Sequence, residues 1–156
     1  MRDLPLVLVV DDNETDALFI LRSLDNAGVK NPLRVVNDGE EFVDYMEGTG
    51  NYEDRKMYPL PGLVLLDLKL PKRDGFELLN WVRGHSKFSA LPVIVLTATQ
   101  ELQDVNRAYQ AGANSFLVKP MNFKDYQGLS DAITAFWLGV AKTPSAVKSV
   151  REKVSK

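Results

Sequence analysis

The stretch LVLVVDD (residues 6–12) is a short apolar run followed by polar residues, and the same pattern recurs in LVLLD (63–67), VIVLT (93–97) and FLVK (116–119). In each stretch a short apolar run stops at a polar residue. Runs of this length are too short for buried helices, so they predict buried strands. Because the strands of a parallel sheet end at one edge, we expect the polar residues that follow them to lie close together.

The polar residues at these strand ends are Asp11, Asp12, Asp67, Thr97 and Lys119. Carboxylate oxygens are the ligands that hard divalent cations prefer. An ammonium and a hydroxyl can neutralise and bind phosphoryl oxygens. The set therefore predicts a site that holds a divalent metal and a phosphoryl group together. Two adjacent acids before a helix could instead serve only to cap it. Capping alone therefore stays an alternative role for Asp11 and Asp12.

The whole chain alternates strand-like and helix-like segments, which is typical of a parallel sheet covered by helices on both faces. We expect strands at Leu6–Val10, Leu33–Val36, Gly62–Leu66, Pro92–Leu96 and Ser115–Val118. Helices are expected after a cap at Asn13 or Asp12, after the turn at 37–39, from 74–75, along a stripe of Leu102, Val105 and Tyr109, and from 122 or 123 to about 140. Residues 51–61 form a polar loop with two prolines, longer than usual.

Length and composition predict one compact domain of a soluble, cytoplasmic protein. At 156 residues the chain can bury one real core. Its apolar runs are far shorter than a membrane span, and its N-terminus lacks the pattern of a signal peptide. The absence of Cys excludes thiolate metal sites and a Cys nucleophile, and the lone His85 cannot build a His-rich metal site.

Charge is distributed unevenly along the chain. The segment from Ala141 has five Lys or Arg and one Glu, a net charge of +4; the whole chain has −2, which leaves −6 for residues 1–140. An acidic body argues against a nucleic-acid surface. The basic segment could touch nucleic acid or anionic lipid, but a solvated end is the simpler interpretation. We therefore expect no nucleic-acid or membrane partner.

Four segments taken in order, VVDDNETD (9–16), LLDLKLPKRDG (65–75), VIVLTAT (93–99) and AGANSFLVKP (111–120), resemble the signature segments of the bacterial two-component response regulator receiver domain. The resemblance spans roughly residues 5–140. It implies a flavodoxin-like, doubly wound, five-stranded parallel sheet with strand order 2-1-3-4-5 and five helices, followed by a C-terminal extension. We therefore expect a receiver domain at 1–140 and a basic extension at 141–156.

The resemblance also implies the chemistry. Asp67 would accept a phosphoryl group from a phosphohistidine of a sensor histidine kinase, as a nucleophile that forms an acyl phosphate. Mg²⁺, or Mn²⁺, would offset the negative charge. Asp12, Asp67 and the main-chain carbonyl of Lys69 would bind the metal directly, and Asp11 mainly through water. Lys119 would contact a phosphoryl oxygen, and Thr97 would donate its hydroxyl to the new phosphoryl group.

Other positions are expected to govern switching and rate. By the resemblance, Phe116 turns inward when Thr97 moves, although ordinary core packing is the alternative for this residue. The bond before Pro120 is a candidate cis peptide that would aim the preceding lysine. Lys69 is hypothesised to pair with the phosphoryl group or a nearby acid and so to alter phosphate lifetime. Thr99 is the second rate-tuning position.

The long loop at 51–61 and the segment TAFWLGVAKTP (134–144) resemble single-domain response regulators that partner bacterial phytochrome kinases. In the last helix the side chains expected to face the core are Tyr126, Leu129, Ile133 and Phe136. Apolar residues at the end of that helix risk exposure. We therefore predict a two-fold homodimer whose interface includes Phe136, Trp137 and Val140, with core packing as the alternative.

Together these features predict a single-domain response regulator that phosphorylation switches for partner binding or dimerisation. It would be an enzyme only for its own phosphorylation and dephosphorylation. One alternative is a pseudo-receiver adaptor that works without phosphorylation. An aspartyl-phosphate phosphatase is less well supported, because Lys69 stands where such enzymes need a second acid. A flavodoxin-like cofactor binder lacks a phosphate loop after the first strand.

Overall fold

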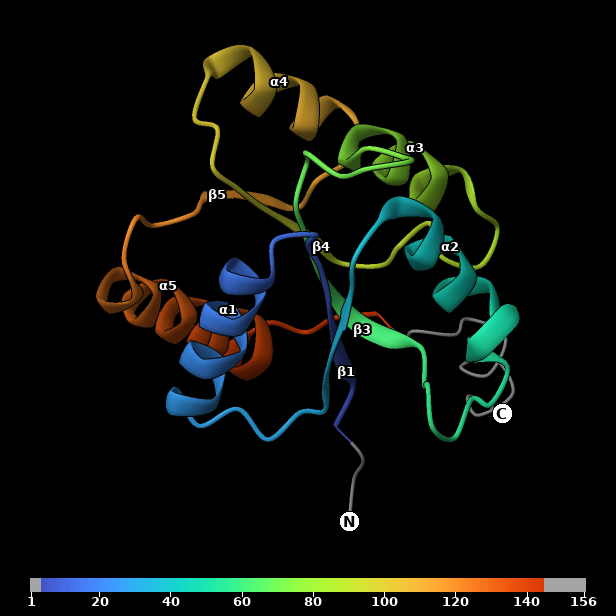
Figure 1. Ribbon diagram of the computed structural model, residues 1–156, viewed down its shortest axis with the longest axis horizontal. Coiled ribbons are helices and arrows are strands. Elements are labelled where there is room, and N and C mark those ends of the chain that lie inside the picture. Colours follow the sequence, from blue (N-terminus) through green and yellow to red (C-terminus); the bar gives the residue numbers. More distant parts are fainter. Residues whose placement is uncertain (1–3, 145–156) are drawn as a thin grey trace.

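The computed structural model describes residues 4–144. They form a five-stranded parallel sheet with helices around it (Figure 1). Its strands lie in the order β2-β1-β3-β4-β5, which confirms the predicted topology. Their bounds are β1 Leu6–Val10, β2 Leu33–Val36, β3 Pro61–Leu66, β4 Val93–Thr97 and β5 Ser115–Val118. The helices are α1 Glu14–Asn26, α2 Gly39–Glu47, α3 Gly75–Gly84, α4 Leu102–Gln110 and α5 Phe123–Ala135, with a 3₁₀ turn η1 at Gly50–Tyr52.

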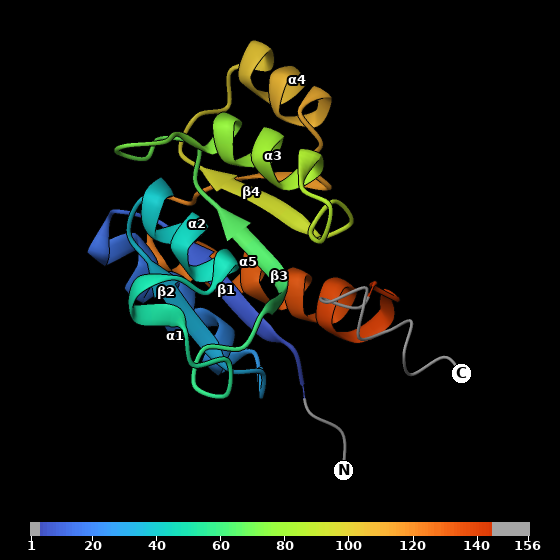
Figure 2. The same ribbon diagram turned by 90° about the vertical axis from the view of Figure 1, so that its right-hand side faces the viewer.

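Two helical layers sandwich the sheet, as Figure 2 shows from the side. Successive residues of a strand point to opposite faces. On β1, Leu6, Leu8 and Val10 accordingly pack in one cluster with side chains of α2, α3 and α4. Val7 and Val9 pack in the other cluster, with side chains of α1 and α5. The central strands are buried on both faces, which explains why they read as unbroken apolar runs.

Side-chain caps fix where four of the helices begin. Asn13, Asp38, Asp74 and Asn122 each accept a hydrogen bond from the main-chain N–H three residues on. These caps satisfy N–H groups that the first helical turn leaves without partners. At α4 the cap residue Glu101 makes no such bond. Instead the Thr99 hydroxyl bonds to the Asp104 carboxylate at 3.1 Å and accepts from the Glu101 N–H at 3.3 Å.

The helix predicted along Leu102, Val105 and Tyr109 is present as α4, but this stripe does not face the core. Leu102 is 72% exposed and Tyr109 is 48% exposed, while the only buried residue of the helix is Ala108. Ala108 packs in the first core cluster, while the larger side chains of Leu102 and Tyr109 remain near solvent. This helix is therefore attached through a much narrower contact than the others.

The last helix also differs from the prediction. Its α-helical part ends at Ala135, and a π-helical turn η2 follows at Phe136–Val140, closed by a bond from the Ala141 N–H to the Phe136 carbonyl. Trp137, four residues after the buried Ile133, continues the core-facing stripe and packs on the second cluster. Phe136 is turned away and is 54% exposed, so its expected place in the core is corrected.

Within residues 4–144, no helix combines the length and apolar character needed to cross a membrane. The basic extension expected from Ala141 lies mostly at 145–156, outside the described residues.

Candidate functional site

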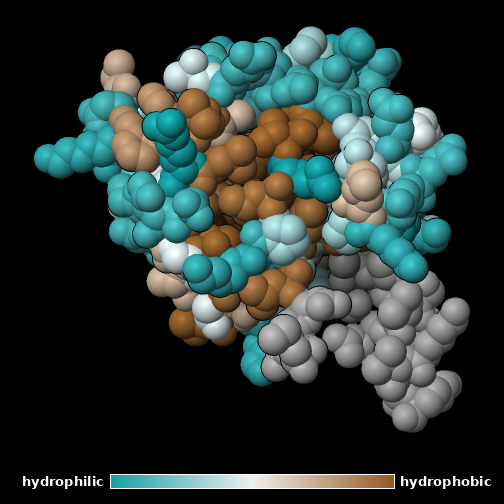
Figure 3. Space-filling model, turned by 60° about the horizontal axis from the view of Figure 1, so that its bottom comes forward, coloured by the Kyte–Doolittle hydropathy of each residue, from teal (hydrophilic) through white to brown (hydrophobic). Residues whose placement is uncertain are grey.

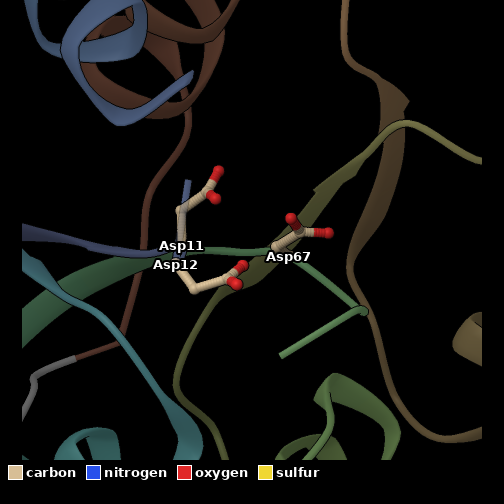
Figure 4. Close-up of side chains that lie close together, drawn as sticks. All are labelled: Asp11, Asp12 and Asp67. Atoms are coloured by element: carbon tan, nitrogen blue, oxygen red, sulfur yellow. The ribbon is translucent and has the colours of Figure 1, made fainter. Parts of the chain in front are cut away.

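Three carboxylates meet at the carboxyl edge of the sheet (Figure 4). Asp11 and Asp12 directly follow β1, and Asp67 follows the neighbouring strand β3. An oxygen from each lies within 4.8 Å of the others. Asp11 and Asp67 are buried and Asp12 is exposed. The convergence that the strand ends predict is therefore present, with one carboxylate open to solvent.

Lys119, which directly follows β5, places its ammonium among these acids. Its Nζ lies 2.8 Å from an oxygen of Asp11 and 2.8 Å from an oxygen of Asp67. Only 6% of the lysine side chain is exposed. Two buried carboxylates therefore share one buried cation, which offsets the cost of removing all three charges from water.

Two buried members of this ion cluster, Asp11 and Lys119, have altered pKa values. Burial raises the pKa of Asp11 above 3.8, and the hydrogen bond from Lys119 only partly opposes this effect. For Lys119, burial alone would lower the pKa, but hydrogen bonds to Asp11 and Asp67 raise it well above 10.5. The lysine is therefore a permanent cation at neutral pH.

Asp67 is held from several sides. Its Oδ1 accepts a hydrogen bond of 2.7 Å from the Thr97 hydroxyl and one of 3.3 Å from the Lys69 N–H. Its Oδ2 accepts from Lys119 at 2.8 Å. Thr97, the last residue of β4, is 1% exposed. The carboxylate is thus fixed in orientation, with a hydroxyl and an ammonium beside it.

The carboxylates fit a divalent cation. Three oxygens at short mutual distance form the kind of hard ligand set that Mg²⁺ and Mn²⁺ accept. Among the described residues, the Asp12 side chain has no hydrogen bond or ion pair, so its oxygens need no rearrangement to bind. The main-chain carbonyl of Lys69 stays a predicted ligand.

The sequence reasoning missed one member of the cluster, Asp16. Its Oδ2 lies 2.9 Å from the Lys119 Nζ. Asn13 caps α1 by accepting the Asp16 N–H, which turns this first helical turn toward the site. An acid four residues after Asp12, just inside a capped helix, was the available signal. A pattern of strand ends does not reach Asp16, because this residue lies inside α1.

Lys69 and Thr99 lie beside the cluster rather than in it. Both line a cavity of about 380 Å³ that also includes Asp12, Phe76 and Arg107. The Arg107 guanidinium stacks 3.9 Å from the centre of the Phe76 ring. Lys69 is exposed, and within the described residues its ammonium has no ion pair. Its hypothesised contact with a nearby acid is therefore absent from this structure, while a contact with a phosphoryl group stays a prediction.

Phe116 and Pro120 complete the predicted set. Phe116 is partly buried against the first core cluster, and its N–H donates to the Tyr109 hydroxyl at 3.1 Å. No cis peptide occurs among the described residues, so the bond before Pro120 is trans and the cis prediction is corrected. Lys119 reaches the carboxylates without it, because its N–H is held by the Thr97 carbonyl at 2.8 Å.

A parallel sheet with this strand order, three carboxylates at its carboxyl edge and a buried lysine between them defines a receiver domain. The chain belongs to the response regulator receiver domain family, whose model matches residues 7–129. Response regulators of this family are signalling proteins. The resemblance found in the sequence segments is thereby confirmed.

Several proteins are similar over nearly their whole length. The probable methanogenesis regulatory protein FilR2 of Methanothrix harundinacea is 36% identical over 142 residues, covering 89% of this chain and 87% of FilR2. The response regulator Rcp1 of Synechocystis is 32% identical over 141 residues, covering 90% and 94%. Its Mn²⁺-bound structure has a TM-score of 0.82 at 31% identity, covering 90% of this chain and 99% of that one.

A third relative is the phosphorylated cyanobacterial phytochrome response regulator RcpA. Its structure has a TM-score of 0.84 at 31% identity and covers 91% of this chain and 99% of the RcpA chain. Each of these matches covers about nine-tenths of this chain.

Proposed function

We propose that this response regulator accepts a phosphoryl group on Asp67 from a phosphohistidine of a sensor histidine kinase. The observation that carries the proposal is the environment of this carboxylate, which is fixed at the end of β3 between the Thr97 hydroxyl and the Lys119 ammonium. A carboxylate oxygen forms the new bond to phosphorus as the bond to the imidazole nitrogen breaks. The electron pair leaves with the imidazole, and an acyl phosphate results.

The neighbouring residues have defined roles in this proposal. Asp12, Asp67 and the main-chain carbonyl of Lys69 hold Mg²⁺, or Mn²⁺, directly, and Asp11 holds it mainly through water. The metal supplies positive charge against two approaching anions. Lys119 places its ammonium against a phosphoryl oxygen and offsets the charge that builds up during transfer. Thr97 donates its hydroxyl to the same group, and Phe116 repacks into the space that the movement leaves. Lys69 and Thr99, at the adjacent cavity, set the rate at which water removes the phosphoryl group.

The kinase partner is proposed to be phytochrome-linked. The relative RcpA is named a phytochrome response regulator. The long loop at 51–61 and the FWL segment at 136–138 also resemble the response regulators that partner phytochrome kinases. FilR2 is named a methanogenesis regulatory protein and not a phytochrome response regulator. Kinases of other pathways should therefore be tested beside a phytochrome-linked one. We assign the receiver to 1–140 and the basic extension to 141–156, and we propose a cytoplasmic protein whose partners are proteins rather than nucleic acid or membrane. It acts as an enzyme only on its own phosphorylation state.

A phosphotransfer assay tests the proposal. Purified kinases, including a phytochrome-linked one, are first labelled on histidine and then mixed with the wild-type protein or with Asp67→Asn in the presence of Mg²⁺. Label is expected on the wild type alone, and a chelator is expected to prevent transfer. Equal labelling of Asp67→Asn would reject the assignment of the phosphoacceptor. No labelling of the wild type by any kinase or by a small acyl phosphate would favour a phosphorylation-independent adaptor.

We further propose that the protein is a two-fold homodimer whose interface includes Phe136, Trp137 and Val140. Phe136 is 54% and Val140 is 76% exposed, which is unusual for large apolar residues so close together. Figure 3 displays a broad apolar area on the side of the molecule that it presents. Near the start of β1 and β3, Trp137 and Val140 also line a cavity of about 290 Å³ with Leu4 and Pro5. Light scattering at tens of micromolar distinguishes dimer from monomer, and a monomer there would remove the claim.

A further inference from the structure

The carboxylates proposed to bind the metal are already occupied by groups of the protein itself. Asp11 accepts from the Asn13 N–H at one oxygen and from Lys119 at the other. Asp67 accepts from Thr97 and the Lys69 N–H at one oxygen, and from Lys119 at the other. A divalent cation that binds Asp67 directly and Asp11 directly or through a water therefore competes with the Lys119 ammonium for these two carboxylates.

Displacing the ammonium without a replacement partner is costly. The Lys119 side chain is 6% exposed, so it cannot simply turn into solvent. A buried charge that loses its partners retains the full cost of its lost hydration. The site must therefore supply another anion for the lysine whenever the first two are engaged.

Asp16 has the properties of that third anion. Its Oδ2 lies 2.9 Å from the ammonium, yet it is not a member of the three-carboxylate cluster. It is carried by α1 rather than by a strand end, and Asn13 fixes its main chain at the first turn of the helix. The Asp16 side chain is 31% exposed, so water can solvate its carboxylate whether or not a metal is bound nearby.

We propose that Asp16 is the alternative counter-ion of Lys119, a positioning residue that holds the ammonium when a divalent cation takes the oxygens of Asp11 and Asp67. Lys119 keeps its ion pair with Asp16 and gives up the other two. The ammonium thus stays beside Asp67, at the place where the proposed phosphoryl group arrives. This last consequence rests on the proposed function, whereas the exchange of partners does not.

Mn²⁺ affinity tests the proposal directly. Electron paramagnetic resonance measures free Mn²⁺ in titrations of the wild-type protein, Asp16→Asn and the matched control Glu14→Gln. Glu14 lies in the same helical turn, loses the same charge, and within residues 4–144 has no ion pair. We expect Asp16→Asn to weaken Mn²⁺ binding about tenfold and Glu14→Gln to weaken it at most about twofold, the latter reflecting only a screened surface charge.

A double-mutant cycle separates the exchange of partners from a direct metal ligand. In a Lys119→Met background there is no ammonium to relocate, so adding Asp16→Asn is expected to change Mn²⁺ affinity at most about twofold. A tenfold loss that persists there would mean that Asp16 acts on the metal itself, and the proposal would be wrong. Equal effects of Asp16→Asn and Glu14→Gln in the wild-type background would also overturn it.

Two further measurements keep the outcome interpretable. Circular dichroism melting verifies that each variant is folded, and Asp16→Ser replaces Asp16→Asn if the latter is not. Phosphotransfer to the wild-type protein is measured in parallel. Coupling between Asp16 and Lys119 without any phosphotransfer would reject the proposed function and leave this inference standing, and phosphotransfer without coupling would do the reverse.

Discussion

The carboxyl edge of the sheet and the end of α5 depart from the usual distribution of side chains in opposite directions. At the edge, charged and polar groups are buried, with Asp11 at 2% and Thr97 at 1% exposure, and each has a partner. At η2, Phe136 and Val140 are large, apolar and open to solvent. Burying a charge requires a partner within the chain, whereas exposing an apolar side chain requires none. The buried groups of the first region are therefore satisfied within one copy of the protein, whereas the second region is where the proposed homodimer would bury apolar surface.

The largest expected effect comes from removing the cation of the carboxyl edge. Lys119→Met leaves Asp11 and Asp67 buried without their shared counter-ion. We expect the free energy of unfolding in a metal-free buffer to fall by about 3 kcal/mol, as in other buried ion pairs that lose one partner. Urea unfolding followed by circular dichroism measures the change.

Lys69→Met is the control, because this lysine is exposed and its ammonium has no ion pair within the described residues. It should change the free energy of unfolding by less than about 0.5 kcal/mol. Added Mn²⁺ should restore part of the stability lost in Lys119→Met, since a cation then returns between the carboxylates. Identical unfolding curves for both variants would contradict the view that the edge is held together by this one cation.

A medium effect is expected at the other region, where neighbouring aromatic residues should behave differently. Trp137 packs on the second core cluster, so Trp137→Ala should lower the free energy of unfolding by about 2 kcal/mol. Phe136→Ala removes a mostly exposed ring and should cost less than about 0.5 kcal/mol in dilute, monomeric protein. Urea unfolding at low micromolar concentration gives both values.

The same pair distinguishes packing within the chain from association between chains. Phe136→Ala should shift light scattering toward the monomer at concentrations where the wild type is dimeric, although the fold is unaffected. If Phe136→Ala proved as destabilising as Trp137→Ala in the monomer, the exposed position of the ring would be wrong.

The smallest effect concerns Tyr126, whose buried hydroxyl has no hydrogen-bond partner among the described residues. Tyr126→Phe removes a polar atom that is unsatisfied, so the free energy of unfolding at neutral pH should rise, by up to about 1 kcal/mol. Tyr45→Phe is the matched control. The Tyr45 hydroxyl donates to the Pro59 carbonyl at 2.8 Å, so its loss should lower the free energy of unfolding by about 1 kcal/mol.

Alkaline pH sharpens this comparison. Burial, with a smaller contribution from Asp16, raises the pKa of Tyr126 from 10.0 to about 12. A folded-state pKa above the unfolded value means that the associated stability is present below pH 10 and is lost as pH rises toward 12. Wild-type stability should therefore fall over this interval more steeply than that of Tyr126→Phe. Parallel pH dependence of the two proteins would show that the hydroxyl is not buried in solution.

The sequence predicted best where local signals determine the structure. Unbroken apolar runs and the polar residue after each one located Asp11, Asp67, Thr97 and Lys119, because a parallel sheet must place all of these at one edge. The cap of α1 was likewise predicted as Asn13 or Asp12, and Asn13 makes this bond to a main-chain N–H only three residues on.

Features that depend on packing between distant elements were missed. Asp16 matters only because β5 places Lys119 next to the first turn of α1, across 103 positions of the chain. The π-helical turn at η2 shifts Phe136 off the core-facing stripe, and helical periodicity alone assumes no such shift. In α4 only Ala108 is buried, and the hydrophobic pattern of the helix does not reveal that Leu102 is exposed.

The bond between the Tyr109 hydroxyl and the Phe116 N–H has a consequence for solubility. β5 is the last strand of the sheet, and an edge strand presents main-chain donors to which a strand of a second molecule can bind. The tyrosine of α4 already occupies one of these donors, at the middle of a strand of only four residues. A helix held by few other contacts thus closes the side on which the sheet could otherwise have grown into an aggregate.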